Sequence, residues 1–346
     1  MGRRRGQEES ATSCVEGLLA QYREAPRPSR AEVLRFSGVG RLDVYNITAP
    51  FFDEGRWVLA GRVEKRFSEV SEVRFFTPDE KGAWRLLPGA PAFPLQDPFV
   101  TRIHGELLFG GVETFIDPEG HPPYFWRWRT VFFRGESLST LRPFARGPIG
   151  MKDIRLVELE DGTIGVFTRP QGERGGRGKI GFFTLSRLDD LQKAPWEEAP
   201  LLEGLFSEEE WGGANEAQLL PGGKVLVLGH VARFGASGHR HYYPMAFVFD
   251  PKDLSHDEAV LLGERQTFLP GPSKHRGVRD VVFPGGLHRI PGEQAVLYAG
   301  ISDAGAQRLW LPDIFAHLGY HPHPLVPRPE DLKDLMAGAT QKIAGG

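Results

Sequence analysis

The apolar residues of this chain fall into short runs separated by polar turns, and from about residue 35 the same order of elements recurs five times. Each repeat opens on a polar residue, continues as an apolar strand, turns, and returns as a second apolar strand. In the second repeat these parts are 97–103, 104–106 and 107–113. The residues at 124–133 alternate between aromatic and charged, which is typical of a strand with one buried face. The pattern predicts an all-β chain.

The polar openings of the repeats are 51 to 64 residues apart and are Asn46, Asp97, Asp153, Glu216 and Asp280. A repeat of about 50–60 residues that contains about four short strands is the signature of a β-propeller. We therefore predict a five-bladed β-propeller, in which closure of the ring removes the exposed sheet edges. The Asp161-Gly162 pair is a strong hairpin signal within the third repeat.

Short extensions, helical or irregular, are expected at both ends of the propeller. We assign residues 1–35 to an N-terminal extension, 36–310 to the propeller, and 311–346 to a C-terminal loop and helix. Within the extensions, the spacing of apolar residues predicts helices at 12–23 and 329–343.

Composition narrows the class of protein. Charged residues make up 25% and hydrophobic residues 40% of the 346 positions, as in ordinary soluble domains. The net charge of −3 gives no bulk attraction to nucleic acid or acidic membranes, so neither is expected as a partner. The single cysteine, Cys14, excludes a disulfide framework and a Cys-rich zinc site. No apolar run is long enough to span a membrane. We expect a cytoplasmic protein, and homo-oligomerisation stays open.

Charged residues recur where the apolar strands begin and end. In three repeats a charge or amide opens the unit and a charge follows sixteen positions later, as in Asn46 and Arg62, Asp97 and Glu113, Asp153 and Arg169. Even spacing across a hairpin returns both side chains to the same end and side of the sheet. A buried charge without a partner is costly, so such a register in every repeat favours function over stability. We expect these side chains to converge on one pocket.

The chemistry of this set suits cleavage of a glycosidic bond. Carboxylates in a rigid concave site can have their pKa values pushed apart, so that one acts as an acid. The cations Arg62, Lys152 and Arg169 would hold an anion such as phosphate. A metal site at His230, His239 and His241 is only weakly indicated, and we expect no metal.

Several segments between residues 40 and 310 together carry a family resemblance: Asn46, Arg62-Val63-Glu64, Asp97-Pro98, Lys152-Asp153, Arg169-Pro170, His230, 280–286 and 298–303. They resemble the five-bladed propeller enzymes of glycoside hydrolase family 130, which are β-mannoside phosphorylases and some mannosidases. The likeness is greater to a related family of unknown function, DUF1861.

The resemblance implies a role for most of the candidates. Asp97 would be the general acid, which protonates the glycosidic oxygen through a sugar hydroxyl. Asp303 would hold the non-reducing sugar, with Asn46 and Arg62 nearby. The remaining candidates are Lys152, Arg169 and His230 for phosphate, and the acids Asp153, Glu216 and Asp280 for substrate.

At two positions the sequence departs from the family pattern, and both departures bear on whether this chain catalyses the family's reaction. Phe99 stands where the family has an arginine, so one cation is missing. Glu113 adds a carboxylate that would repel phosphate, which favours hydrolysis with Glu113 as the base, or a different substrate. The loop at 169–179 would supply replacement cations (Arg174, Arg177 and Lys179) or is a solvated turn.

The sequence therefore predicts a carbohydrate-active enzyme that cleaves a glycosidic bond by hydrolysis or phosphorolysis. It would need no cofactor, with inorganic phosphate as a co-substrate in phosphorolysis and a small carbohydrate as ligand. A propeller that binds a sugar or sugar phosphate without catalysis is the main alternative. A protein-interaction propeller is the third.

Overall fold

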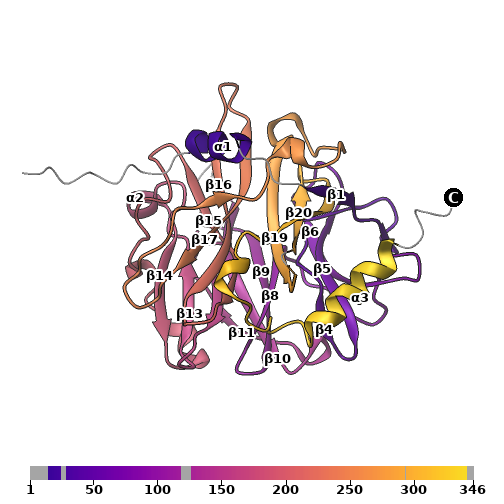
Figure 1. Ribbon diagram of the computed structural model, residues 1–346, viewed down its shortest axis with the longest axis horizontal. Helices are drawn as coiled ribbons and strands as arrows, with labels where there is room; N and C mark the ends of the chain where they lie inside the picture. The colour runs from indigo at the N-terminus through magenta and orange to yellow at the C-terminus, as the bar shows by residue number, and fades with distance from the viewer. Residues whose placement is uncertain (1–14, 25–28, 118–125, 293, 341–346) are drawn as a thin grey trace, which may run out of the picture.

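The computed structural model of the chain describes residues 15–24, 29–117, 126–292 and 294–340. In these residues the chain is mostly β, with helices at its two ends (Figure 1). The described strands form four hydrogen-bonded sheets. The largest sheet divides into two successive mainly antiparallel groups, so five groups correspond to the five repeats.

The first two groups follow the first two repeats. Group one contains β3 (Asp43–Tyr45), β4 (Phe51–Asp53), β5 (Arg56–Glu64), β6 (Ser71–Pro78) and β7 (Trp84–Leu86), with β2 (Phe36–Ser37) parallel to β7. Group two contains β8 (Gln96–Ile103), β9 (Glu106–Ile116), β10 (Trp126–Gly135) and β11 (Arg142–Arg146).

The remaining groups complete the sheet-forming part. Group three contains β12 (Arg155–Glu158), β13 (Ile164–Thr168) and β14 (Gly181–Leu185). Group four contains β15 (Trp211–Leu219), β16 (Val225–Phe234), β17 (Arg240–Phe249) and β18 (Val260–Leu261). Group five contains β19 (Asp280–Ile290), β20 (Gln294–Ile301), β21 (Gly305–Pro312) and, from the N-terminus, β1 (Arg30–Val33).

Strand β1 changes the boundary that the sequence suggested. It pairs antiparallel with β21 along the whole of its length, so the last group is completed by a strand from the start of the chain. The sheet-forming part therefore begins at Arg30, inside the range assigned to the N-terminal extension. A short parallel pairing of β17 with β19, at His241 with Asp280, joins groups four and five into one sheet.

Five buried apolar clusters lie between neighbouring groups. Phe99, Phe132 and Ile154 belong to the cluster between groups two and three. The decisive cluster contains Val44 and Phe76 of group one together with Val296 and Tyr298 of group five. Because the last group packs against the first, the groups form a closed succession in which each pair shares a core.

Within the described residues, the α-helices are α1 (Val15–Glu24), α2 (Gly172–Gly175), in the loop after β13, and α3 (Pro329–Thr340). Short 3₁₀ turns are η1 (Leu138–Thr140), η2 (Leu188–Lys193), η3 (Trp196–Glu198), η4 (Arg265–Thr267), η5 (Arg276–Val278) and η6 (Ala316–Leu318). Helices were predicted near α1 and α3, and α3 buries Leu332 and Met336 as its apolar spacing indicates. Residues 12–14 and 341–343 of those predictions lie outside the described part.

None of the helices in the described ranges is long and apolar enough to cross a membrane. The predicted strand at 124–133 begins, within the described residues, at Trp126 and continues to Gly135.

Candidate active site

Four of the predicted site residues adopt a left-handed backbone conformation. The φ angles are 43° at Asn46, 48° at Asp97, 58° at Asp153 and 51° at Asp303. Asn and Asp tolerate this region better than other non-glycine residues, yet each such position still costs about 1–3 kcal/mol. Residues with a strained backbone occur most often at active sites. The strain at these four candidates therefore supports a functional role.

Bulges set the register of these residues at the start of each group. The β8–β9 pairing shifts between Gln96 and Phe99, which places Asp97 in a bulge. In group four the shift falls between Ala214 and Glu216, so Asn215 takes the corresponding place. A bulge adds one residue and re-aims the side chain, so the sequence register is displaced by one residue at Glu216.

Glycine takes the corresponding place in group five. The β19–β20 pairing shifts between Pro284 and Gly286, at Gly285. A Cβ atom on Gly285 would lie 1.5 Å from the carbonyl oxygen of Ile47, so no side chain fits there. Asp280, the opening residue predicted for this group, therefore lies elsewhere.

Asp97 is held by two neighbours from group one. Its Oδ1 atom accepts a hydrogen bond of 2.7 Å from Asn46 Nδ2 and lies 3.3 Å from Arg62 Nη1. All three side chains are buried. Arg62 thus forms its ion pair with the acid of the next group, Asp97. The hairpin register had predicted that it would lie beside Asn46. Both contacts fall on one oxygen, and they fix the orientation of the carboxylate.

A chain of alternating charges continues from Arg62. Its Nη2 atom lies 2.9 Å from Glu64 Oε2 and 3.3 Å from Glu69 Oε2. Lys274 Nζ lies 2.6 Å from Glu64 Oε1 and 2.8 Å from Glu69 Oε1. The Tyr45 hydroxyl also donates to Glu64. Two buried cations therefore share two carboxylates, of which Glu64 is buried and Glu69 is 67% exposed.

Asp303 is a candidate carboxyl whose pKa is raised. Burial raises the pKa of Asp303 to about 6, and the Asp97 charge adds to the rise while Arg62 opposes it. A carboxyl with such a pKa carries its proton at mildly acidic pH and can donate it to a hydroxyl.

Asp153 and Arg169 form a second buried pair. Arg169 Nε lies 3.4 Å from Asp153 Oδ2 and donates a 2.6 Å hydrogen bond to the Gly212 carbonyl. Burial alone would raise the pKa of Asp153, but the charges of Arg169 and Lys152 outweigh it and hold that pKa below its ordinary value. The hairpin register predicted this pair, and the structure brings its side chains together.

His230 lies beside this pair. Its Nδ1–H donates a 2.8 Å hydrogen bond to Asn215 Oδ1, and its ring stacks on Tyr242 at a centroid distance of 5.3 Å. Burial lowers the pKa of His230 to about 3, so the imidazole is neutral at physiological pH. Its Nε2 atom is then an acceptor rather than a cationic group.

Unpaired polar atoms gather at these residues. Within the described part of the chain, buried atoms that lack a hydrogen-bond partner include Asn46 Oδ1, both oxygens of Asp153, Arg169 Nη1 and Asn215 Nδ2. Each such atom costs about 1–3 kcal/mol, and native proteins rarely tolerate several together. Their concentration marks the place where a polar ligand would complete the hydrogen bonding.

A hollow of about 660 Å³ opens beside these residues, and we call it the aromatic hollow. Its cations are Arg127, Lys152, Arg169, Arg177 and Arg240. Its aromatic side chains are Trp126, Trp128, Trp211, Phe234 and Tyr242. The Glu69 carboxylate also lines it. Aromatic faces and cations suit a ligand that contains both a sugar and an anion.

The glycine-rich loop at 169–179 has a structural explanation. A Cβ atom on Gly178 would lie 2.5 Å from Arg169 Cζ, so the glycine makes room for that guanidinium. Of the three cations proposed as replacements, Arg177 lines the aromatic hollow, whereas Arg174 donates to the carbonyl groups of Glu198 and Ala199.

Phe99, the departure from the family motif, packs in the core between groups two and three. The Arg155 guanidinium lies over its ring at 4.4 Å and donates a 2.7 Å hydrogen bond to the Asn215 carbonyl. The charges of Asp153 and Asp97 both act on Arg155, although burial still lowers its pKa. A buried cation from β12 thus lies directly against Phe99.

Three predicted site residues have other surroundings. Glu113 pairs with Arg129 at 2.6 Å. Glu216 accepts from His323 Nε2 at 2.9 Å and from the Leu287 amide at 2.7 Å, which ties β15 to β19 and the C-terminal loop.

Asp280 is about half exposed and lies 3.7 Å from His241. Among the described residues, no group of three or more His, Cys, Asp or Glu side chains is placed to hold a metal ion.

The sequence reasoning missed Lys274, Arg155 and Asn215. Lys274 lies in a loop outside the repeat, so periodicity gave no sign of it. Arg155 is the first residue of β12, and the apolar run of that strand conceals it. Asn215 directly precedes Glu216, and the repeat pattern favours the acidic residue of the two.

The fold and these buried charges define a mostly-β protein with a central carboxylate and cation site. Residues 21–317 match the family model described as "Protein of unknown function (DUF1861)". The chain belongs to this family, as its sequence indicated. No curated protein matches the chain.

Solved structures add relatives whose activities are described. Mannose phosphorylase MPT-4 from Leishmania mexicana, in complex with phosphate ion, is 33% identical and has a TM-score of 0.82 over 90% of this chain and 96% of its own. MPT-1 from the same organism, a GDP-Man-dependent mannosyltransferase, is 30% identical and has a TM-score of 0.81 over 90% and 98%.

A more distant likeness concerns the fold alone. The β-1,2-mannobiose phosphorylase from Listeria innocua is 15% identical and has a TM-score of 0.56 over 83% of this chain and 93% of its own. The chain is therefore related to glycoside phosphorylases, and some of its relatives are mannosyltransferases.

Proposed function

We propose that the five strand groups are the blades of a five-bladed β-propeller. The shared core between the first and last groups supports this proposal, because it closes the succession. The pairing of β1 with β21 supports it too, since a strand from the N-terminus completes the last blade. The polar residues at the start of the first four blades then face the axis, and Gly285 takes that place in the fifth.

We further propose that the protein is a phosphorylase that cleaves a mannoside with inorganic phosphate. The observation that carries the proposal is the concentration of unpaired buried polar atoms between carboxylates and cations beside the aromatic hollow. The likeness to MPT-4, a mannose phosphorylase that was solved with phosphate, supports the substrate class.

In this mechanism a phosphate oxygen attacks the anomeric carbon as the glycosidic carbon–oxygen bond breaks. The departing oxygen takes a proton from Asp97, directly or through a sugar hydroxyl, and a sugar 1-phosphate forms. Asn46 and Arg62 orient Asp97, and Asp303 binds the sugar. Lys152 and Arg169 hold the phosphate charge. Neutral His230 accepts a hydrogen bond from a protonated phosphate oxygen or a sugar hydroxyl.

Hydrolysis with Glu113 as base has less support. The Glu113 carboxylate is paired with Arg129, which offsets the repulsion that it would exert on phosphate. We assign no catalytic role to Glu113, Glu216 or Asp280. Asp153 is assigned to positioning Arg169, because its oxygens lie nearest to that guanidinium.

Glycosyl transfer from a nucleotide sugar is the second candidate. It is favoured by the likeness to MPT-1, which covers the same share of this chain as the likeness to the phosphorylase. The same acid and sugar-binding residues would serve both reactions, which differ in the group that carries the mannose.

The test is turnover of mannose 1-phosphate with mannose or short mannosides as acceptors, followed as release of inorganic phosphate. An Asp97→Asn variant should lose at least about a hundredfold in kcat, since general acid catalysis contributes roughly 10²–10⁴-fold. It should still bind mannose 1-phosphate.

A matched control is Asp161→Asn, in the exposed turn between β12 and β13, which should keep full activity. Full activity of Asp97→Asn would show that the acid is another residue. Binding of mannose 1-phosphate without turnover in the wild-type protein would leave a sugar-phosphate-binding propeller.

A further inference from the structure

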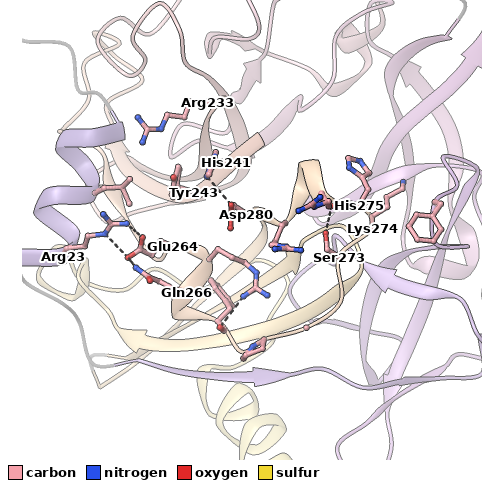
Figure 2. Close-up of a pocket in the computed structure, with 18 residues that line it drawn as sticks. Arg23, Arg233, His241, Tyr243, Glu264, Gln266, Ser273, Lys274, His275 and Asp280 are labelled. Carbon is pink, nitrogen blue, oxygen red and sulfur yellow. Dashed lines mark hydrogen bonds and ion pairs between the residues drawn. The ribbon is translucent and has the colours of Figure 1, made fainter. Parts of the chain in front are cut away.

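A second, larger hollow lies beside the central site. It has a volume of about 1,030 Å³ and is bounded by α1, β16, β17 and the segment 264–280 (Figure 2). We call it the arginine hollow. Figure 2 shows Arg23 and Glu264 at one end, Asp280 and His241 in the middle and Lys274 at the other end. Since Lys274 also pairs with Glu64 and Glu69, the hollow adjoins the charge network around Asp97.

The charges of this hollow are unbalanced. Three lining guanidinium groups, at Arg265, Arg276 and Arg279, have no carboxylate within ion-pair distance among the residues that the structure describes. Arg265 donates instead to neutral groups, with its Nε atom 3.1 Å from the Ser302 hydroxyl. Of the two lining carboxylates, Glu264 pairs with Arg23. Asp280 lies 3.7 Å from His241, and its charge also acts on Arg265 from beyond ion-pair distance.

An aromatic side chain stands at the rim of the same hollow. Phe67 is 76% exposed and has a φ of 69°. A bulky residue is rare in this backbone region, and the strained backbone costs about 1–3 kcal/mol of stability. Because the ring is exposed, packing of its side chain does not offset the cost of this strained backbone. A planar ligand stacked on the ring would account for it, because nucleobases stack on aromatic side chains.

We propose that the arginine hollow binds a nucleoside diphosphate. The diphosphate lies against Arg265, Arg276 and Arg279, and the base stacks on Phe67. Three unpaired guanidinium groups match the charge of two phosphates better than that of one. The site is distinct from the phosphate-binding group of Lys152, Arg169 and His230, and its occupancy can be measured without turnover.

Calorimetric titration at about 0.15 M salt, where exposed charges are well screened, tests this site. The probes are guanosine diphosphate, adenosine diphosphate, pyrophosphate and guanosine. Arg276→Gln/Arg279→Gln should raise the Kd of both diphosphates and of pyrophosphate by about tenfold or more. Phe67→Ala should weaken both diphosphates by about tenfold and leave pyrophosphate unchanged. All three positions are exposed, and thermal melting checks that the variants fold.

Arg41→Gln/Arg85→Gln is the matched control, with the same change of charge at two exposed arginines of the first group. An equal loss of affinity in this control would show a non-specific charge effect and overturn the proposal. So would diphosphates that bind no better than guanosine, or that bind the Arg276/Arg279 variant as tightly as the wild type. Inorganic phosphate, titrated in parallel, reports on the group at Lys152, so failure at one site is distinguishable from failure at the other.

Discussion

Replacement of Asp303 by Asn should make the protein more stable at neutral pH. Asp303 is partly buried, and its carboxyl group ionises against both desolvation and the like charge of Asp97. Asparagine has nearly the same size and shape but carries no charge, so the substitution removes the cost of ionisation and leaves the packing in place. We therefore expect Asp303→Asn to lose sugar binding while it gains stability.

The magnitude follows from the shift in acidity. Burial raises the pKa of Asp303 from 3.8 to about 6, and one pKa unit corresponds to about 1.4 kcal/mol, so the ionised carboxylate costs at most about 3 kcal/mol. Because the pKa in the folded state is higher than in the unfolded state, the folded protein holds the proton more tightly. The free energy of unfolding falls as pH rises through the window between 3.8 and about 6. Above that window the cost is fully present.

Urea denaturation at several pH values from about 4 to 8 measures this dependence. The gain in Asp303→Asn should be small near pH 4 and reach about 2–3 kcal/mol near pH 8. Asp153→Asn is the control of opposite sign, since Arg169 and Lys152 hold the pKa of Asp153 below its ordinary value despite burial. Its carboxylate stabilises the fold above the unfolded pKa, so the Asp153→Asn variant should lose stability near pH 8.

The result that would refute this reasoning is a loss of stability in Asp303→Asn that is the same at every pH. Such a loss would mean that the carboxylate makes essential hydrogen bonds, and that burial does not disfavour its ionised form.

Two further substitutions test the surroundings of the site. Gly178→Ala should displace the Arg169 guanidinium and weaken phosphate binding, with a loss of about 1–3 kcal/mol in stability. Gly176→Ala, in the same loop and also at positive φ but with open space around it, should leave phosphate affinity unchanged, and equal effects on affinity would contradict the steric argument. Glu69→Gln should tighten phosphate binding by about 0.5–1 kcal/mol, since it uncovers charge on two buried cations, and calorimetry that found weaker binding would contradict this.

Much of the fold could be predicted from the sequence, because the local patterns of apolar and turn residues agree with the structure. The turn at Asp161-Gly162 is one case: Gly162 adopts a φ of 80°, and Asp161 Oδ1 accepts a 2.9 Å hydrogen bond from the Thr163 amide. Short apolar runs predicted the strands, because strands such as β16 and β20 are buried on both faces and therefore read as continuous apolar segments. The pairing of β1 with β21 was not predictable, since it joins the two ends of the sheet-forming part and leaves no local trace.

The site residues could be predicted where a polar residue directly precedes an apolar run. Asp97 and Asp153 were found because each precedes an apolar strand. The regular repeat pattern points to Glu216, whereas the bulge places Asn215 in the site, because a single extra residue moves every later side chain to the other face. The sequence carries no signal for this bulge. Lys274 was missed for a different reason, since it reaches Glu64 from a loop more than two hundred residues away.

The ion pair between Glu69, which lines the aromatic hollow, and Lys274, which lines the arginine hollow, links the two hollows. Arg62 and Lys274 are each shared by Glu64, which is buried, and Glu69, which is 67% exposed. Removing the buried partner would leave two uncompensated charges, whereas an exposed carboxylate can move into water at little cost. We therefore expect an anion that approaches either cation to displace Glu69 and to leave Glu64 in place. Because Lys274 lines the arginine hollow and Glu69 lines the aromatic hollow, an anion bound in one changes the charge presented to the other, and this coupling must be reciprocal.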